Sequence, residues 1–190
     1  MSAPRYRPAT AADAAAIGDL HADSWRRHYR GAYADAYLDG DVVTERRAVW
    51  SSRLAASVGA DADAGVGPSG THTVVAECDG RLVGFVHVVL GDDPVWGSLV
   101  DNLHVARSQH RSGIGTQLLA RAALAVDGPM YLWVLRQNTA AQQFYLAVGG
   151  ECVGSATVSA PGGDPARLVG TPEKLRMAWS DVTGLDMRRR

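Results

Sequence analysis

The segment from Leu99 to Val126 constrains the fold more than any other part of the chain. Leu99–Val105 has the apolar pattern of a strand, 110–116 is a glycine-rich turn, and the residues from about Gly113 to Val126 have the spacing of a helix. A strand that leads through glycines directly into a helix is a unit of α/β folds. We therefore expect an α/β protein.

Further strands and helices are expected on both sides of this unit. Thr73–Cys78 and Arg81–Leu90 flank Asp79-Gly80, a dipeptide typical of a two-residue β-hairpin. The other expected elements are strands at 5–9, 130–135, 152–159 and 174–179, and helices at 11–29, 33–57 with a break near Gly40, and 139–148. Their order predicts a mixed sheet with helices on its faces.

Three local patterns refine the first third of the chain. Thr10, followed three residues later by Asp13, resembles a capping box at the start of the first helix. Val49, Arg53 and Ala56 have helical spacing and are expected on one face. Residues 58–70 are mostly Gly, Ala, Asp and Ser, which indicates a mobile loop within one sheet rather than a domain linker.

Size and composition favour one domain over residues 1–190, with 181–190 as a candidate flexible tail. The formal net charge of -1 provides no broad basic field, so we expect no nucleic-acid partner. The longest apolar runs, such as Leu82–Leu90, are too short to cross a bilayer, so we expect no membrane partner. Cys78 and Cys152 are far apart and lack metal-ligand spacing, which favours a cytoplasmic protein without a metal. Monomer and homodimer both stay open.

The glycine-rich turn has the composition of a phosphate site. Free N–H groups and the dipole at a helix start attract anions, Gly113 and Gly115 let a diphosphate approach the backbone, and Arg111 adds positive charge. The turn lacks the Gly-Lys-Ser/Thr of a P-loop, and Leu118 stands where a dinucleotide fingerprint needs a third glycine. A turn that binds nothing is the alternative.

Asn138 and Tyr145 are seven residues apart on the last expected helix. Seven steps of about 100° return to nearly the same face, displaced by ~10 Å along the axis. An amide and a phenol could thus line one elongated ligand. The alternatives are a helix N-cap for Asn138 and a core position for Tyr145.

These motifs together resemble the GNAT superfamily of acetyl-coenzyme A-dependent N-acetyltransferases. Residues 101–105 resemble the family's fourth strand, and the turn resembles its Arg/Gln-x-x-Gly-x-Gly/Ala motif, with His110 in place of the first residue. Residues 138–149 resemble Asn-x-x-Ala-x-x-Phe-Tyr-x-x-x-Gly. The resemblance implies a single-domain, mostly antiparallel sheet, splayed between strands 4 and 5, with acetyl-coenzyme A (acetyl-CoA) in the gap.

The resemblance also implies the cofactor contacts. Main chain of Leu103, His104 and Val105 would bind the pantetheine arm and polarise the thioester. The turn would hold the pyrophosphate through His110, Arg111, Ser112, Gly113, Ile114, Gly115 and Thr116. Asn138 would contact the arm, and Tyr145 would lie near the sulfur.

Acetyl transfer to an amine needs a base and an acid, because most aliphatic amines are protonated at neutral pH and the thiolate must leave. Tyr145 is the candidate acid and Asp101 the candidate base; a purely structural role for Asp101 is equally open. Glu77 and His87 are weaker alternatives for the base. Cys152 has no accompanying base for a covalent route, so direct transfer in a ternary complex is expected.

The expected acceptor is the primary amine of a small molecule, with a protein or peptide amine as the alternative. Trp25, Tyr29, Tyr33 and the loop around Gly65 are candidates for the acceptor pocket. The six histidines are interpreted as scattered surface residues without metal-ligand spacing. A CoA-binding regulatory or pseudo-enzyme domain and a pure interaction module are the competing functions.

Overall fold

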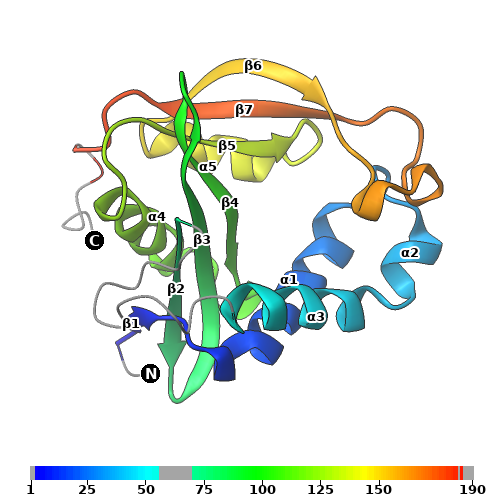
Figure 1. Ribbon diagram of the computed structural model, residues 1–190, viewed down its shortest axis with the longest axis horizontal. Helices are drawn as coiled ribbons and strands as arrows, with labels where there is room; N and C mark the ends of the chain where they lie inside the picture. Colours follow the sequence, from blue (N-terminus) through cyan, green and yellow to red (C-terminus); the bar gives the residue numbers. More distant parts are fainter. Residues whose placement is uncertain (1–2, 56–69, 184, 186–190) are drawn as a thin grey trace.

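The computed structural model describes residues 3–55, 70–183 and 185. Its centre is a seven-stranded sheet in the order β1-β2-β3-β4-β5-β7-β6, with helices packed against it (Figure 1). Neighbouring strands are antiparallel except for β4 and β5, which are parallel. The predicted mixed, mostly antiparallel α/β sheet is therefore confirmed.

The elements follow the predicted order closely. The strands are β1 Arg5–Pro8, β2 Thr71–Cys78, β3 Arg81–Asp93, β4 Gly97–Val105, β5 Met130–Leu135, β6 Glu151–Thr157 and β7 Glu173–Trp179. The α-helices are α1 Ala14–His28, α2 Asp35–Asp39, α3 Val42–Ala55, α4 Ile114–Leu124 and α5 Thr139–Ala147. Short 3-10 turns occupy Ala11–Asp13, Arg107–Gln109, Pro161–Gly163 and Pro165–Arg167. No helix in these described ranges is both long and apolar enough to cross a membrane.

The β2–β3 hairpin forms where the sequence predicts it. Asp79 and Gly80 both have positive φ, 49° and 74°, as a type I′ turn requires. Cys78 and Arg81 are the last registered pair before the turn.

The sheet bends sharply where β4 meets β5. The two strands share only two registered pairs, Ser98 with Met130 and Leu99 with Tyr131, after which they diverge. Figure 1 shows β2, β3 and β4 upright, whereas β5, β6 and β7 cross above them. The predicted splay between the fourth and fifth strands is thus present, and it opens the middle of the sheet.

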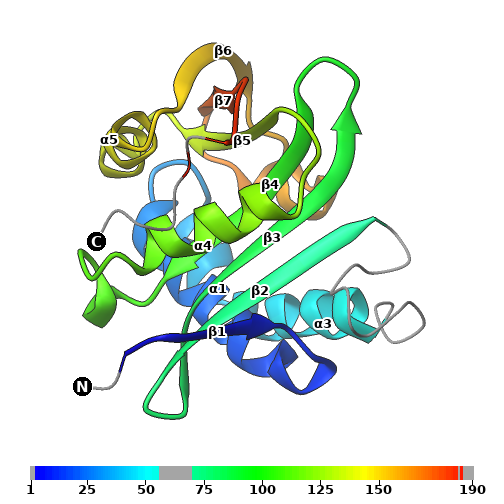
Figure 2. The same cartoon turned by 90° about the vertical axis from the view of Figure 1, so that its left-hand side faces the viewer.

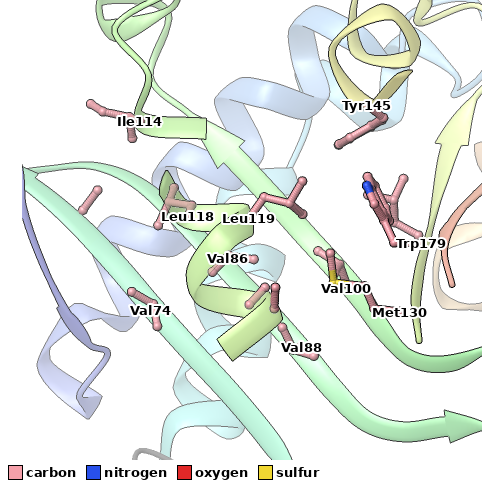
Figure 3. Packing of buried hydrophobic residues seen from close by; sticks show 14 of the residues in the cluster. Val74, Val86, Val88, Val100, Ile114, Leu118, Leu119, Met130, Tyr145 and Trp179 are labelled. Atoms are coloured by element: carbon pink, nitrogen blue, oxygen red, sulfur yellow. The ribbon is translucent and has the colours of Figure 1, made fainter. Parts of the chain in front are cut away.

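Alternate residues of β2 and β3 face two separate cores, as the two-residue period of a strand requires. Val74 and Val86 pack with Leu118 of α4 in the larger core (Figure 3). Val75 and Phe85 point to the other side, where α1 and α3 cover them. Figure 2 shows α5 beside β5, β6 and β7, far from β1.

The predicted start of the first helix is confirmed, and α3 forms with a buried face that the helical spacing did not identify. The Thr10 amide donates to the Asp13 carboxylate at 2.7 Å, as in a capping box. In α3, Trp50 and Leu54 are buried, whereas Val49 and Arg53 are only partly covered. The indole of Trp50 fills the space beside Phe85, which sets the rotation of the helix.

Three expectations fall wholly or partly on residues that the structure does not describe. Ala56, the loop at 58–69 with Gly65, and most of the tail at 181–190 lie outside the described residues.

Candidate active site

A cleft of about 790 Å³ occupies the gap between β4 and β5. The end of β4, the turn before α4, the end of β5 and helix α5 line it, and residues of α1 complete it. The lining includes every predicted cofactor-contacting or catalytic residue except Ser112. Those residues are Asp101, Leu103, His104, Val105, His110, Arg111, Gly113, Ile114, Gly115, Thr116, Asn138 and Tyr145.

The turn before α4 presents peptide N–H groups to this cleft. Gln117 N donates to Gly113 O at 3.0 Å, so the N–H groups of Ile114, Gly115 and Thr116 precede the first intrahelical bond. Gly113 has φ 84°, and even Arg111 has φ 63°, in the left-handed region. Such backbone concavities at a helix start bind anions.

Ser112 lies in the turn but not in the cleft lining. Its hydroxyl donates to Gln109 O at 2.6 Å, which closes the turn upon itself. The side chain thus has a local structural partner that explains its position.

Main chain of β4 faces the gap beyond Leu99. Ala106 N donates to Val83 O on the β3 side at 2.8 Å. Because peptide groups alternate along a strand, Val105 and Leu103 direct theirs toward β5. His110 Nε2 lies 3.0 Å from Val105 O, so this nitrogen carries the proton and the imidazole holds the turn against the strand.

Asn138 and Tyr145 both line the cleft from α5. The Asn138 side chain accepts from Ala141 N at 3.3 Å, so it is also the N-cap of α5. The Tyr145 ring lies edge-on to Trp179 with centroids 6.1 Å apart, at one end of the larger core (Figure 3). Burial raises the pKa of Tyr145, so its hydroxyl is protonated at neutral pH.

Asp101 lies at the cleft with two donors already in contact. Arg53 Nη1 and Asn102 Nδ2 lie 2.8 Å and 2.7 Å from its Oδ2. Neither Glu77, which pairs with Arg7, nor His87 lines the cleft. Of the three candidate bases, the structure brings only Asp101 to the gap.

The interpretation of the histidines as surface residues is wrong for His21 and His87, and His104 is only partly exposed. His21 and His87 are each 3% exposed; His21 accepts from the Trp50 indole at 3.0 Å, and His87 lies 2.7 Å from the Thr73 hydroxyl. His104 Nδ1 lies 2.8 Å from the Ser24 hydroxyl. Burial, more than neighbouring charge, lowers the pKa of His87 and of His104 to about 4, so both are neutral at pH 7.

A second cavity of about 260 Å³ adjoins the cleft, and we call it the acceptor cavity. Tyr29, Asp101 and Trp133 are among the residues that line both spaces. Trp25 and Tyr33 line the acceptor cavity but not the cleft. The aromatic residues singled out in the sequence therefore gather here. Arg46 and Lys174 also line it, and no sequence motif marked either residue.

The positions of the candidate metal-binding and nucleophilic side chains can be given for the described residues. No group of three or more His, Cys, Asp or Glu in that part of the chain could hold a metal ion. Cys78 is buried, and Cys152 is exposed on β6 and lines neither space.

Comparisons with known proteins agree with this geometry. Residues 69–149 match the model of an acetyltransferase (GNAT) domain. A comparison with curated protein sequences gives no match.

Several solved structures resemble the whole chain. PaiA N-acetyltransferase from Thermoplasma acidophilum, in complex with coenzyme A, is 16% identical, with 95% of this chain and 100% of that chain covered and a TM-score of 0.68. YncA from Salmonella typhimurium, with acetyl-CoA, is 18% identical, with 100% of this chain and 98% of that chain covered and a TM-score of 0.61. A GCN5-related N-acetyltransferase from Rhodopseudomonas palustris is 22% identical, with 95% of this chain and 97% of that chain covered and a TM-score of 0.66.

Proposed function

We propose that this chain, whose residues 69–149 match an acetyltransferase (GNAT) domain, transfers an acetyl group from acetyl-CoA to the amine of a small molecule. The observation that carries the proposal is the gap between β4 and β5, with a glycine-rich helix start at the cleft that fills it. PaiA and YncA, which share the fold, bind coenzyme A and acetyl-CoA.

The residues of the cleft suit an elongated, anionic ligand. N–H groups of Ile114, Gly115 and Thr116 would receive the diphosphate, since they have no intrahelical acceptor. Peptide groups of Leu103 and Val105 would pair with the amides of the pantetheine arm, because β5 has already diverged from β4 at this point and does not pair with them.

The groups near the centre of the gap suit the chemistry. Acetyl-CoA supplies the acetyl group as a thioester, which a neutral amine attacks. A main-chain N–H of β4 would stabilise the negative charge that develops on the acetyl oxygen. Tyr145 would protonate the leaving sulfur, and Asp101 would accept the proton of the amine, directly or through water.

The size of the acceptor cavity supports a small-molecule amine. At about 260 Å³ it is slightly smaller than the ~300–1,000 Å³ typical of small-molecule pockets. A peptide acceptor would need an extended groove; acetylation of peptide amines in preference to small amines would contradict this part of the proposal.

The cofactor assignment is tested at Gly115 rather than Gly113, because φ 84° makes any side chain at Gly113 strained in itself. A Cβ on Gly115 would meet Phe144 at 3.4 Å, an ordinary contact. Acetyl-CoA at 100 times its Kd should stabilise the wild type by about 2.7 kcal/mol. For a chain of this size this corresponds to a rise of roughly 5–10 °C in melting temperature.

Gly115→Glu places a carboxylate at the expected diphosphate and should abolish this rise. Gly115→Gln has the same shape without the charge and is the matched control; it should keep part of the rise. Equal shifts in wild type and Gly115→Glu would remove the turn from the site. Release of CoA with a panel of amines then tests turnover, and binding without turnover of any amine would favour a regulatory domain.

A further inference from the structure

The charges that line the acceptor cavity are unbalanced. Arg46, Arg53 and Lys174 are cationic, whereas Asp101 is the carboxylate among the lining residues. The Asp101–Arg53 ion pair, at 2.8 Å, accounts for one cation. Two cations therefore face a small, aromatic-walled cavity without a lining carboxylate of their own.

Arg46 is the better placed of the two for an anionic ligand. Its side chain is 15% exposed, and its guanidinium lies 4.4 Å from the centre of the Trp25 ring. Its Nε is buried and has no hydrogen-bond partner among the described residues. A buried guanidinium nitrogen without an acceptor is costly, because it has lost water and gained nothing in return.

The nearest carboxylate does not satisfy Arg46. Glu45 is 3.9 Å away, beyond hydrogen-bond distance. Its oxygens are engaged instead by Arg167, at 3.0 Å, and by the Tyr37 hydroxyl, at 2.9 Å. Nε itself has almost no exposed surface, so the terminal guanidinium nitrogens are the donors of Arg46 that remain available to a ligand in the cavity.

Lys174 reaches the same cavity from β7. Its ammonium lies 4.5 Å from the centre of the Trp133 ring, and no carboxylate of the described residues is within ion-pair distance. Burial, and then the positive charge of Arg176, lowers the pKa of Lys174. An anion beside this ammonium would oppose both effects, because it stabilises the charged form of the lysine.

We propose that the acceptor is a small amine that also carries a carboxylate, and that Arg46, assisted by Lys174, binds this carboxylate. The inference rests on the proposed function, since it concerns the acceptor of that transfer. Asp101 lines both the cleft and the acceptor cavity, whereas Arg46 and Lys174 line only the cavity. The amine would therefore face the gap at Asp101, and the carboxylate would face the guanidinium, whose planar fork suits it.

The same arrangement disfavours simple amines. An amine without an anionic group would add its ammonium charge to those of Arg46 and Lys174 in a partly dry space, and like charges there repel strongly. A zwitterionic acceptor instead brings a charge of each sign to the group that matches it.

The test uses acetylated products, because acetylation removes the charge of the amine and leaves the carboxylate as the only difference. The N-acetyl derivatives of alanine, leucine and phenylalanine, each paired with its carboxamide, are titrated into the CoA-bound protein by calorimetry. The wild type should bind at least one carboxylate about tenfold or more tightly than its carboxamide, as a charge-assisted bond predicts.

Arg46→Gln should reduce this preference to nearly one. Arg47→Gln is the matched control, because Arg47 lies on the same helix, pairs with Asp19 and lines neither space. It should keep the preference. Lys174→Gln, which leaves α3 intact, should weaken the preference severalfold and covers the event that Arg46→Gln does not fold.

Equal affinities for carboxylate and carboxamide in the wild type would overturn the inference, as would an unchanged preference in both Arg46→Gln and Lys174→Gln. Turnover of the free amino acids and their amides separates the two proposals. Acetylation of both at equal rates would overturn the inference and leave the proposed function standing. A carboxylate preference in binding, with no acetylation of any amine, would leave the anion site standing and remove the proposed function.

Discussion

Replacing Tyr145 with phenylalanine removes one oxygen atom from the end of α5 and keeps the ring. Tyr145 is 8% exposed, and its ring packs edge-on against Trp179 with the ring centroids 6.1 Å apart. Phenylalanine would fill the same volume and bury the same apolar surface. The change therefore separates what the hydroxyl does from what the aromatic ring does.

The structure sets the expected size of each effect. The Tyr145 hydroxyl makes no hydrogen bond to the described residues, so its loss leaves no partner unsatisfied, and the free energy of unfolding should change by less than about 0.5 kcal/mol. If the hydroxyl protonates the departing sulfur, turnover should fall by roughly 10²-fold or more. This corresponds to about 3 kcal/mol in the activation barrier.

The assay measures kcat, acetyl-CoA affinity and urea unfolding on the same preparation of Tyr145→Phe. The affinity should change little, because the missing interaction belongs to the transition state. A variant that unfolds more easily but turns over at the normal rate would refute the assignment and make Tyr145 a core residue.

Two further predictions concern other titratable groups. Asp101→Asn should lower turnover by roughly 10²-fold and remove the low-pH limb of the rate profile. The control is Arg53→Gln, which breaks the same ion pair but should keep that limb. A normal rate in Asp101→Asn would assign the base elsewhere. Stability should fall as the pH drops from about 6.5 toward 4, because the unfolded chain then binds protons that buried His87, with its pKa of about 4, does not. At pH 5 this residue alone should account for about 2 kcal/mol by urea unfolding, and His87→Gln should lose that share of the pH dependence; an unchanged dependence would contradict it.

Local chemistry explains why the fold was largely predictable. Asp79-Gly80 supplies two residues that tolerate positive φ, and the alternation of β2 and β3 determines which side chains enter which core. The rotation of α3 was not predictable, because it depends on how Trp50 packs beside Phe85, a contact between residues 35 positions apart in the chain. Periodicity alone does not determine which of two adjacent faces an amphipathic helix buries.

Some residues of the candidate site could likewise be predicted from the sequence, and others could not. The turn and α5 carry motifs, and the family resemblance of these motifs implies that their residues line one cleft. Arg46 and Lys174 carry none, because their importance arises from α3 and β7 meeting at one cavity. The buried histidines were missed for a related reason: His21 and His87 have partners, Trp50 and Thr73, that only tertiary packing brings within reach.

The short pairing of β4 with β5, at only two registered residue pairs, has a consequence for hydrogen exchange. Amide protons in the middle of a sheet normally exchange slowest, because they are released only by large opening motions. Here the peptide groups of Leu103 and Val105 face a gap at the centre of seven strands, so they should exchange as readily as those of an edge strand. The centre of the sheet would then be no better protected than its edges, and the exchange rates of these two amides would report directly on whether the cleft is filled.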